Sequence, residues 1–189
     1  MMKKLILFFV AVLFAANVSA QQGAMVLSGT LDISSGTEMF GETGVDVTTI
    51  LIAPSFQYFL SDRFSLGAQV GLSTTSLDIE GFDDRLNVVL AGVFARYYLL
   101  RTERFGIFGQ LNVGAGFANE AAGDLTVVGI DVVPGIQYFI NSRWSVEAHL
   151  APVLAFSSTI FPGDEDSVNT FNAGFNRVAP LAVGFSFHF

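Results

Sequence analysis

A glutamate and a histidine two residues apart, Glu147 and His149, have the clearest capacity for chemistry in this sequence. With a hydroxyl from Ser145 or Ser157 they have the residue types of a hydrolase. The same two side chains are potential metal ligands, but a metal site needs at least a third ligand. Nothing in the spacing fixes a serine–histidine–glutamate geometry. We therefore predict no catalytic residues, no metal site and no cofactor.

Polar residues also recur inside segments that are otherwise apolar. Arg96 lies deep within one such segment, and Asp131 and Glu147 are acidic residues able to pair with it. Because an unpaired charge is costly away from water, these groups should form a hydrogen-bonded network. The predicted network consists of Arg96, Asp131, Glu147, His149, Gln57 and Gln137.

The segments that hold these residues alternate with a period of two. In residues 50–60, one face carries apolar side chains and the other carries small or polar ones, and residues 128–140 and 144–156 repeat the pattern. Successive side chains of a β-strand point to opposite faces, so each segment is predicted to be a two-faced strand. Many segments are ~10 to 16 residues long, which exceeds the usual ~5 to 6. A tilted strand needs ~9 to 11 residues to cross a membrane, so length and alternation together indicate a transmembrane β-barrel.

A repeat within the chain sets the number of strands. Arg63, Arg104 and Arg143 each follow a short polar turn and precede an aromatic residue, at intervals of 41 and 39 residues. A propeller blade has a similar period, but it holds four short strands, whereas each period here holds two long ones. With one strand before the set and one after it, we predict eight. The predicted strands are 24–34, 45–60, 64–78, 86–100, 105–119, 125–140, 144–157 and 173–189.

The remaining connections are longer and rich in glycine and acidic residues. They cover residues 35–44, 79–84, 120–124 and 158–172. Short turns at one end and long loops at the other are typical of outer-membrane barrels, whose short turns face the periplasm. We therefore expect four acidic loops on the outer side.

The N-terminus predicts export. Lys3 and Lys4 precede an apolar run from Leu5 to Ala16, and Val18-Ser19-Ala20 follows, as in a signal peptide cleaved after Ala20. The run is shorter than the ~20 residues that span a bilayer. Residues 21–189 would form the mature barrel domain. Loss of the two lysines lowers the formal charge from −8 to −10, which argues against nucleic acid as a partner. The chain has no cysteine, which excludes disulfides and thiolate metal sites.

The last nine residues, Leu181-Ala-Val-Gly-Phe-Ser-Phe-His-Phe189, resemble the terminal strand of bacterial outer-membrane proteins. Gly184, Phe187 and Phe189 stand where that signal has its glycine, its aromatic residue and its terminal phenylalanine. With the hairpin repeats, the mature chain resembles the outer-membrane β-barrel family of the OmpA/OmpX type, an all-β, eight-stranded antiparallel up-and-down fold. The resemblance implies a Gram-negative outer membrane, contact with its lipid and lipopolysaccharide, and recognition by periplasmic chaperones and the barrel assembly machinery. It also implies a monomer.

The interior of an eight-stranded barrel is just wide enough for side chains to fill it. The polar network is therefore expected to be a plug that holds the barrel's shape, and its alternative is a narrow, gated path for ions or small solutes. The expected function is a structural and interaction protein that displays acidic loops in envelope integrity or adhesion. A porin-like channel is the alternative, followed by a lipid-modifying enzyme.

Overall fold

The structure is a computed structural model that describes residues 23–40, 43–79, 82–120, 123–160, 167–174 and 182–189. The predicted signal peptide, 1–20, lies outside these residues. Among them, no helix is long and apolar enough to cross a membrane. The strands are β1 (Met25–Phe40), β2 (Thr43–Phe59), β3 (Phe64–Ile79), β4 (Phe82–Arg101), β5 (Phe105–Glu120), β6 (Gly123–Phe139), β7 (Trp144–His149), β8 (Leu154–Ile160), β9 (Ser167–Ala173) and β10 (Ala182–His188).

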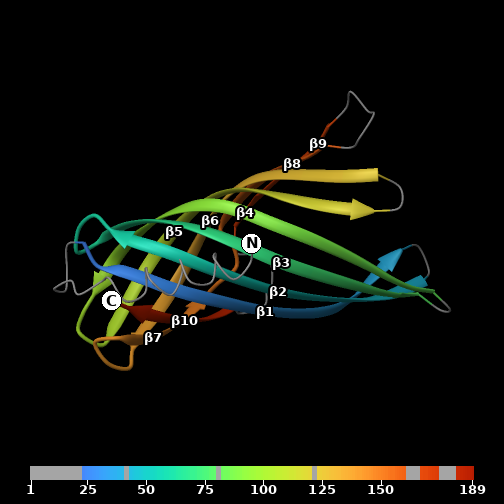
Figure 1. The fold of residues 1–189 in the computed structure, drawn as a ribbon. Helices are drawn as coiled ribbons and strands as arrows, with labels where there is room; N and C mark the ends of the chain where they lie inside the picture. The colour runs from blue at the N-terminus through green and yellow to red at the C-terminus, as the bar shows by residue number, and fades with distance from the viewer. Residues whose placement is uncertain (1–22, 41–42, 80–81, 121–122, 161–166, 175–181) are drawn as a thin grey trace, which may run out of the picture.

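Eight of these strands close a ring. β1 to β6 each pair antiparallel with the next strand in the chain, and β10 pairs with both β7 and β1. β8 and β9 form a further hairpin that continues from β6. Figure 1 shows this hairpin leading away in a different direction from the long β1–β2 and β3–β4 hairpins. Closure pairs strands without leaving an edge, which is why a barrel can satisfy its backbone in lipid.

The predicted alternation places the apolar side chains outside. Leu72 and Val93 are 65% and 59% exposed on the outer face, whereas Gln69 and Phe94, one or three residues away, face the interior. Large exposed apolar side chains continue around the ring on every strand from β1 to β6. An apolar surface of this extent needs lipid rather than water as its solvent.

The three short turns lie where the arginine repeat predicts them. Each is closed by a backbone hydrogen bond: Leu60 N to Phe64 O, Thr102 N to Phe105 O, and Ile140 N to Trp144 O. A side chain in each turn strengthens it, since the hydroxyls of Ser61 and Thr102 and the carboxamide oxygen of Asn141 accept hydrogen bonds from backbone amides three residues ahead. These turns mark what we call the short-turn end of the barrel, and the opposite end is the hairpin end.

The prediction of four long loops is wrong in its boundaries. β1 continues to Phe40 and β2 begins at Thr43, so most of residues 35–44 are strand. In the same way, β3 ends and β4 begins within residues 79–84, and β5 ends and β6 begins within residues 120–124. The region 158–172 holds the end of β8 and most of β9. A cross-strand partner supplies the backbone hydrogen bonds there, so residues with low strand propensity still pair.

The seventh and eighth predicted strands are also wrong as continuous elements. The segment 144–157 breaks between β7 and β8 at residues 150–153, where Pro152 has no amide to donate to a ladder. The backbone stays beside β6, because Leu150 N and Val153 N bond to Pro134 O and Val132 O. In the segment 173–189, Ala173 ends β9, Gly174 takes a φ of 110°, and β10 begins at Ala182.

Candidate functional site

The lumen at the short-turn end is filled by aromatic rings. Phe59, Tyr98 and Phe108 are fully buried, with ring centroids 5.8 Å apart for Phe59 and Tyr98 and 5.7 Å for Tyr98 and Phe108. Val26 completes the cluster. Sequence reasoning missed this aromatic layer, although Phe59 lies two residues after Gln57 and Tyr98 two residues after Arg96, both members of the predicted network. The period-two alternation of the sequence therefore already indicated that these rings face the lumen.

Glycines on neighbouring strands make room for these rings. A Cβ on Gly135 would collide with the ring of Phe108, and a Cβ on Gly106 would lie 3.1 Å from the ring of Tyr98. Gly67 stands in the same relation to Phe94, which lies four residues before Tyr98 on β4 and so further from the short-turn end. Glycine within a strand often marks such a close approach, so these positions let large rings cross a narrow lumen.

Arg101 caps the aromatic layer through a β-bulge. The β4–β5 register shifts between Tyr98 and Leu100, so Leu99 and Leu100 both lie outside and the next residue turns inward. The guanidinium carbon of Arg101 then lies 4.5 Å from the ring centroid of Phe59, with the rings of Tyr98 and Phe139 within 5.6 Å. Such cation–aromatic contacts close the short-turn end.

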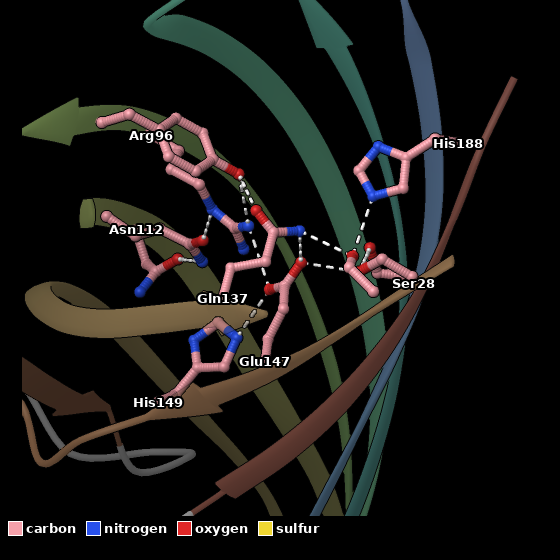
Figure 2. Close-up of polar contacts among 11 residues, drawn as sticks. Ser28, Arg96, Asn112, Gln137, Glu147, His149 and His188 are labelled. Atoms are coloured by element: carbon pink, nitrogen blue, oxygen red, sulfur yellow. Dashed lines mark hydrogen bonds and ion pairs between the residues drawn. The ribbon is translucent and has the colours of Figure 1, made fainter. Parts of the chain in front are cut away.

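An ion pair crosses the lumen directly above this layer. Arg96 Nη1 lies 2.9 Å from Glu147 Oε2, and their side chains are only 3% and 2% exposed. Arg96 also donates to Gln110 Oε1 at 2.9 Å and stacks 4.0 Å from the centroid of Phe108. Figure 2 shows Arg96, Gln137 and Glu147 turned toward one another inside the barrel. The arginine comes from β4 and the glutamate from β7, two strands that are not neighbours.

The carboxylate of Glu147 accepts hydrogen bonds from several other side chains of the network. Its Oε1 accepts from Gln137 Nε2 at 2.9 Å and from Ser186 Oγ at 2.6 Å, and its Oε2 lies 3.1 Å from His149 Nε2. Gln137 Oε1 accepts from the Tyr98 hydroxyl at 2.7 Å, which joins the polar layer to the aromatic layer. A buried charge held by this many hydrogen bonds is well satisfied.

Asp131 belongs to a side branch rather than to the ion pair. Gln110 Nε2 donates to Asn112 Oδ1 at 2.7 Å, and Asn112 Nδ2 donates to Asp131 Oδ2 at 2.8 Å. The structure thus connects Arg96 to Asp131 only through these two amides. Of the two carboxylates considered as partners for Arg96, Glu147 is the one in contact.

Gln57 stands apart from the predicted network. It is buried in the lumen, but its Oε1 has no hydrogen-bond partner among the described residues, and the same holds for Ser65 Oγ.

The aromatic residues of the C-terminal signal lie together at the short-turn end. The ring of Phe187 packs edge-on against the rings of Trp144 and Phe189, with 4.9 Å between the centroids in each pair. Gly184 faces the lumen between β1 and β7.

The residue types of a hydrolase do not form a relay here. The hydroxyl of Ser145 lies 2.8 Å from His188 Nε2 and accepts from Gln137, while Glu147 contacts the other histidine, His149. Ser145 is fully buried, so a substrate has no access to it. The arrangement therefore suits a packed network rather than nucleophilic attack.

A cavity of about 590 Å³ lies beyond the polar network, toward the hairpin end. Its walls are mostly apolar or glycine, and the network forms its polar floor. The lining side chains include Leu51, Ala53, Leu90, Phe94, Val127 and Val133 on the walls, and Asp32, Arg96, Asn112, Asp131, Glu147 and His149 among the polar groups.

Comparison with known proteins identifies the fold. No family model matches the chain, and no curated protein matches it. Among solved structures, the outer membrane protein OprG from Pseudomonas aeruginosa aligns with a TM-score of 0.53 and 14% identity, covering 89% of this chain and 97% of that one. Neisserial surface protein A aligns with a TM-score of 0.51 and 13% identity, covering 90% and 100%. The chain has the fold of the small bacterial outer-membrane β-barrels.

The predicted fold class, an eight-stranded antiparallel barrel, is thereby confirmed. The outer face has the matching distribution of aromatic residues. Tyr58, Tyr97, Phe105, Tyr138 and Trp144 flank the short turns and are all exposed by more than a third. Outer-membrane barrels place such residues as a girdle at the edge of the lipid, so this ring marks one membrane interface.

Proposed function

We propose that this chain is an exported outer-membrane protein whose barrel is a plugged anchor, and that it acts as a structural and interaction protein. The observation that carries the proposal is the double closure of the lumen. The rings of Phe59, Tyr98 and Phe108 fill one layer, and the Arg96–Glu147 ion pair crosses the next. An ion on its way through would have to displace both layers.

The polar layer supports a plug rather than a path because its groups satisfy one another. Glu147 accepts hydrogen bonds from Gln137 and Ser186 besides its contact with Arg96. Opening a route between them would separate a buried pair, which costs several kcal/mol when one partner loses the other (~3 to 5). A water-filled pore would leave these groups solvated and apart.

The interaction role rests on charge and on the long hairpins. The chain has 17 acidic and 9 basic residues, which give a formal charge of −8. Most of the acidic residues that the structure describes lie on the strands near the hairpin end, where Asp46 is exposed on β2. In an outer membrane, the short turns would face the periplasm and the hairpins the outside. Divalent cations would then bridge these carboxylates to the phosphates of lipopolysaccharide, which makes that lipid the first proposed partner.

Single-channel recording in planar bilayers tests the plug. Refolded residues 21–189 should give no steady conductance. A variant in which Tyr98, Phe108, Arg96 and Glu147 are all replaced by alanine should give reproducible steps, because it removes two of the three rings and also the ion pair. Tyr97→Ala is the matched control: it truncates a lipid-facing ring on the same strand and should stay silent.

Steady conductance from the unmodified barrel would overturn the proposal in favour of a channel. A folded fourfold variant without any conductance would show that these two layers are not the barrier. Heat-modifiable gel migration establishes that each variant has formed its barrel before it is recorded.

A further inference from the structure

The cavity above the plug has the size and lining of a ligand site. Its volume of about 590 Å³ lies within the ~300 to 1,000 Å³ of small-molecule sites, which are mainly apolar with a few convergent polar groups. The walls include Leu51 on β2, Leu90 on β4 and Val127 on β6. Because the plug closes one end, the cavity is a cup with an apolar wall and a polar floor.

The charged side chains that line the cup carry a net negative charge. The guanidinium of Arg96 is already paired with Glu147 at 2.9 Å. Asp32 on β1 and Asp131 on β6 also line the cup, and neither forms a salt bridge within the residues that the structure describes. Asp131 is oriented by the Asn112 amide, which donates to its Oδ2 at 2.8 Å.

A cation held beside Asp32 and Asp131 would balance their negative charge, whereas an anion would be repelled by it. The apolar wall above favours a hydrocarbon chain, because burying it removes apolar surface from water. We propose that the cup binds a single-chain amphiphile with a cationic head, its chain along Leu51 and Leu90 and its head at Asp131 and Asp32. This goes beyond the proposed anchoring function, since a ligand bound above an intact plug need not cross the barrel.

Methyl-resolved NMR of the barrel in lipid nanodiscs tests the proposal. The probes share one chain length and differ only in the head: decyltrimethylammonium, decanol and decanoate. We expect saturable shifts of the Leu51 and Leu90 methyl signals, with decyltrimethylammonium binding roughly tenfold or more tighter than decanoate, as for a partly buried charge pair. Leu72 is 65% exposed on the lipid face, so its methyl signals report partition of the probe into the bilayer. These signals should not follow the saturation curve of the Leu51 and Leu90 signals.

Asp131→Asn should remove most of the preference for the cationic head, because asparagine keeps the size and the acceptor for Asn112. Asp62→Asn is the matched control, since it deletes the same charge in an exposed short turn. Ala53→Phe should abolish binding by filling the cup. If that variant does not fold, Ser73→Leu fills the cup from the neighbouring strand and should have the same effect.

Three results would overturn the proposal: lumen shifts that never saturate, equal or tighter binding of decanoate, or an unchanged preference in Asp131→Asn. Each is distinct from failure of the plug, which is read from conductance without any probe. A conducting barrel that still binds decyltrimethylammonium in the cup would reject the plug and keep the site.

Discussion

Replacing Glu147 with glutamine should destabilise the barrel by about 3 to 5 kcal/mol, because it leaves the Arg96 guanidinium buried without its counter-ion. The two groups lie 2.9 Å apart, and neither side chain is more than 3% exposed. Glutamine has nearly the volume of glutamate and retains an acceptor for Ser186 Oγ. The loss therefore measures the charge rather than a cavity.

The neighbours of Arg96 place the cost toward the lower end of that range. The guanidinium keeps its hydrogen bond to Gln110 Oε1 at 2.9 Å and its position 4.0 Å from the Phe108 centroid. A cation over an aromatic face recovers on the order of 1 to 2 kcal/mol when it is desolvated. We therefore expect about 3 kcal/mol for Glu147→Gln alone.

Adding Arg96→Met should restore much of this stability, since the double variant buries no unpaired charge. The two substitutions should then be non-additive by at least about 2 kcal/mol, within the range for residues in direct contact. Urea unfolding from lipid vesicles, followed by the fluorescence of Trp144, measures each free energy, and this is the only tryptophan of the chain.

A second cycle supplies the control. Thr74 Oγ1 donates to Asn87 Oδ1 at 2.9 Å at an exposed position. Thr74→Val and Asn87→Ala should couple by no more than about 1 kcal/mol, as for a single exposed hydrogen bond. Additive losses in the Arg96–Glu147 cycle would refute the view that these charges stabilise each other across the lumen.

Two further predictions concern the outer face and the packing of the rings. Val93→Arg should cost about 2 to 4 kcal/mol in the same unfolding assay, because it places a charge in the lipid near mid-strand, whereas Ser142→Arg in an exposed short turn should change stability by less than about 0.5 kcal/mol. Gly135→Ala should cost about 1 to 3 kcal/mol by displacing the Phe108 ring, and Phe108→Leu should recover part of that loss. Gly29→Ala, which meets open space, should have little effect, so equal losses at the two glycines would contradict the packing argument.

The local pattern of the sequence determined the strands of the ring and their two faces. Alternation is set by the geometry of a single strand, so it predicts that Arg96, Gln137 and Glu147 face inward without knowledge of any partner. The short turns are equally local, because the residues of each turn, such as Asn141, supply its hydrogen bonds. The period-two alternation of the strands and the residues of the short turns together determined the fold class.

The ends of the strands depended on their partners. Residues 35–44 are rich in glycine and acidic residues and have the composition of a loop, yet β1 and β2 pair as far as Phe40 and Thr43. Pairing supplies hydrogen bonds that no single segment can provide, so propensity alone underestimates the hairpins. The break between β7 and β8 was visible in Pro152, whose missing amide is a local property.

Closure of the ring decided which inward residues meet. Arg96 and Glu147 lie 51 positions apart on strands that share no ladder, and only the diameter and stagger of the barrel bring them to 2.9 Å while Asp131 is reached through Asn112. The contact of Phe108 with Gly135 follows from the register of the neighbouring strands β5 and β6, whereas closure leaves the cup unfilled above the plug. Alternation specifies the direction of a side chain, but contact across a lumen depends on distances that the chain acquires only when its first strand, β1, pairs with its last, β10.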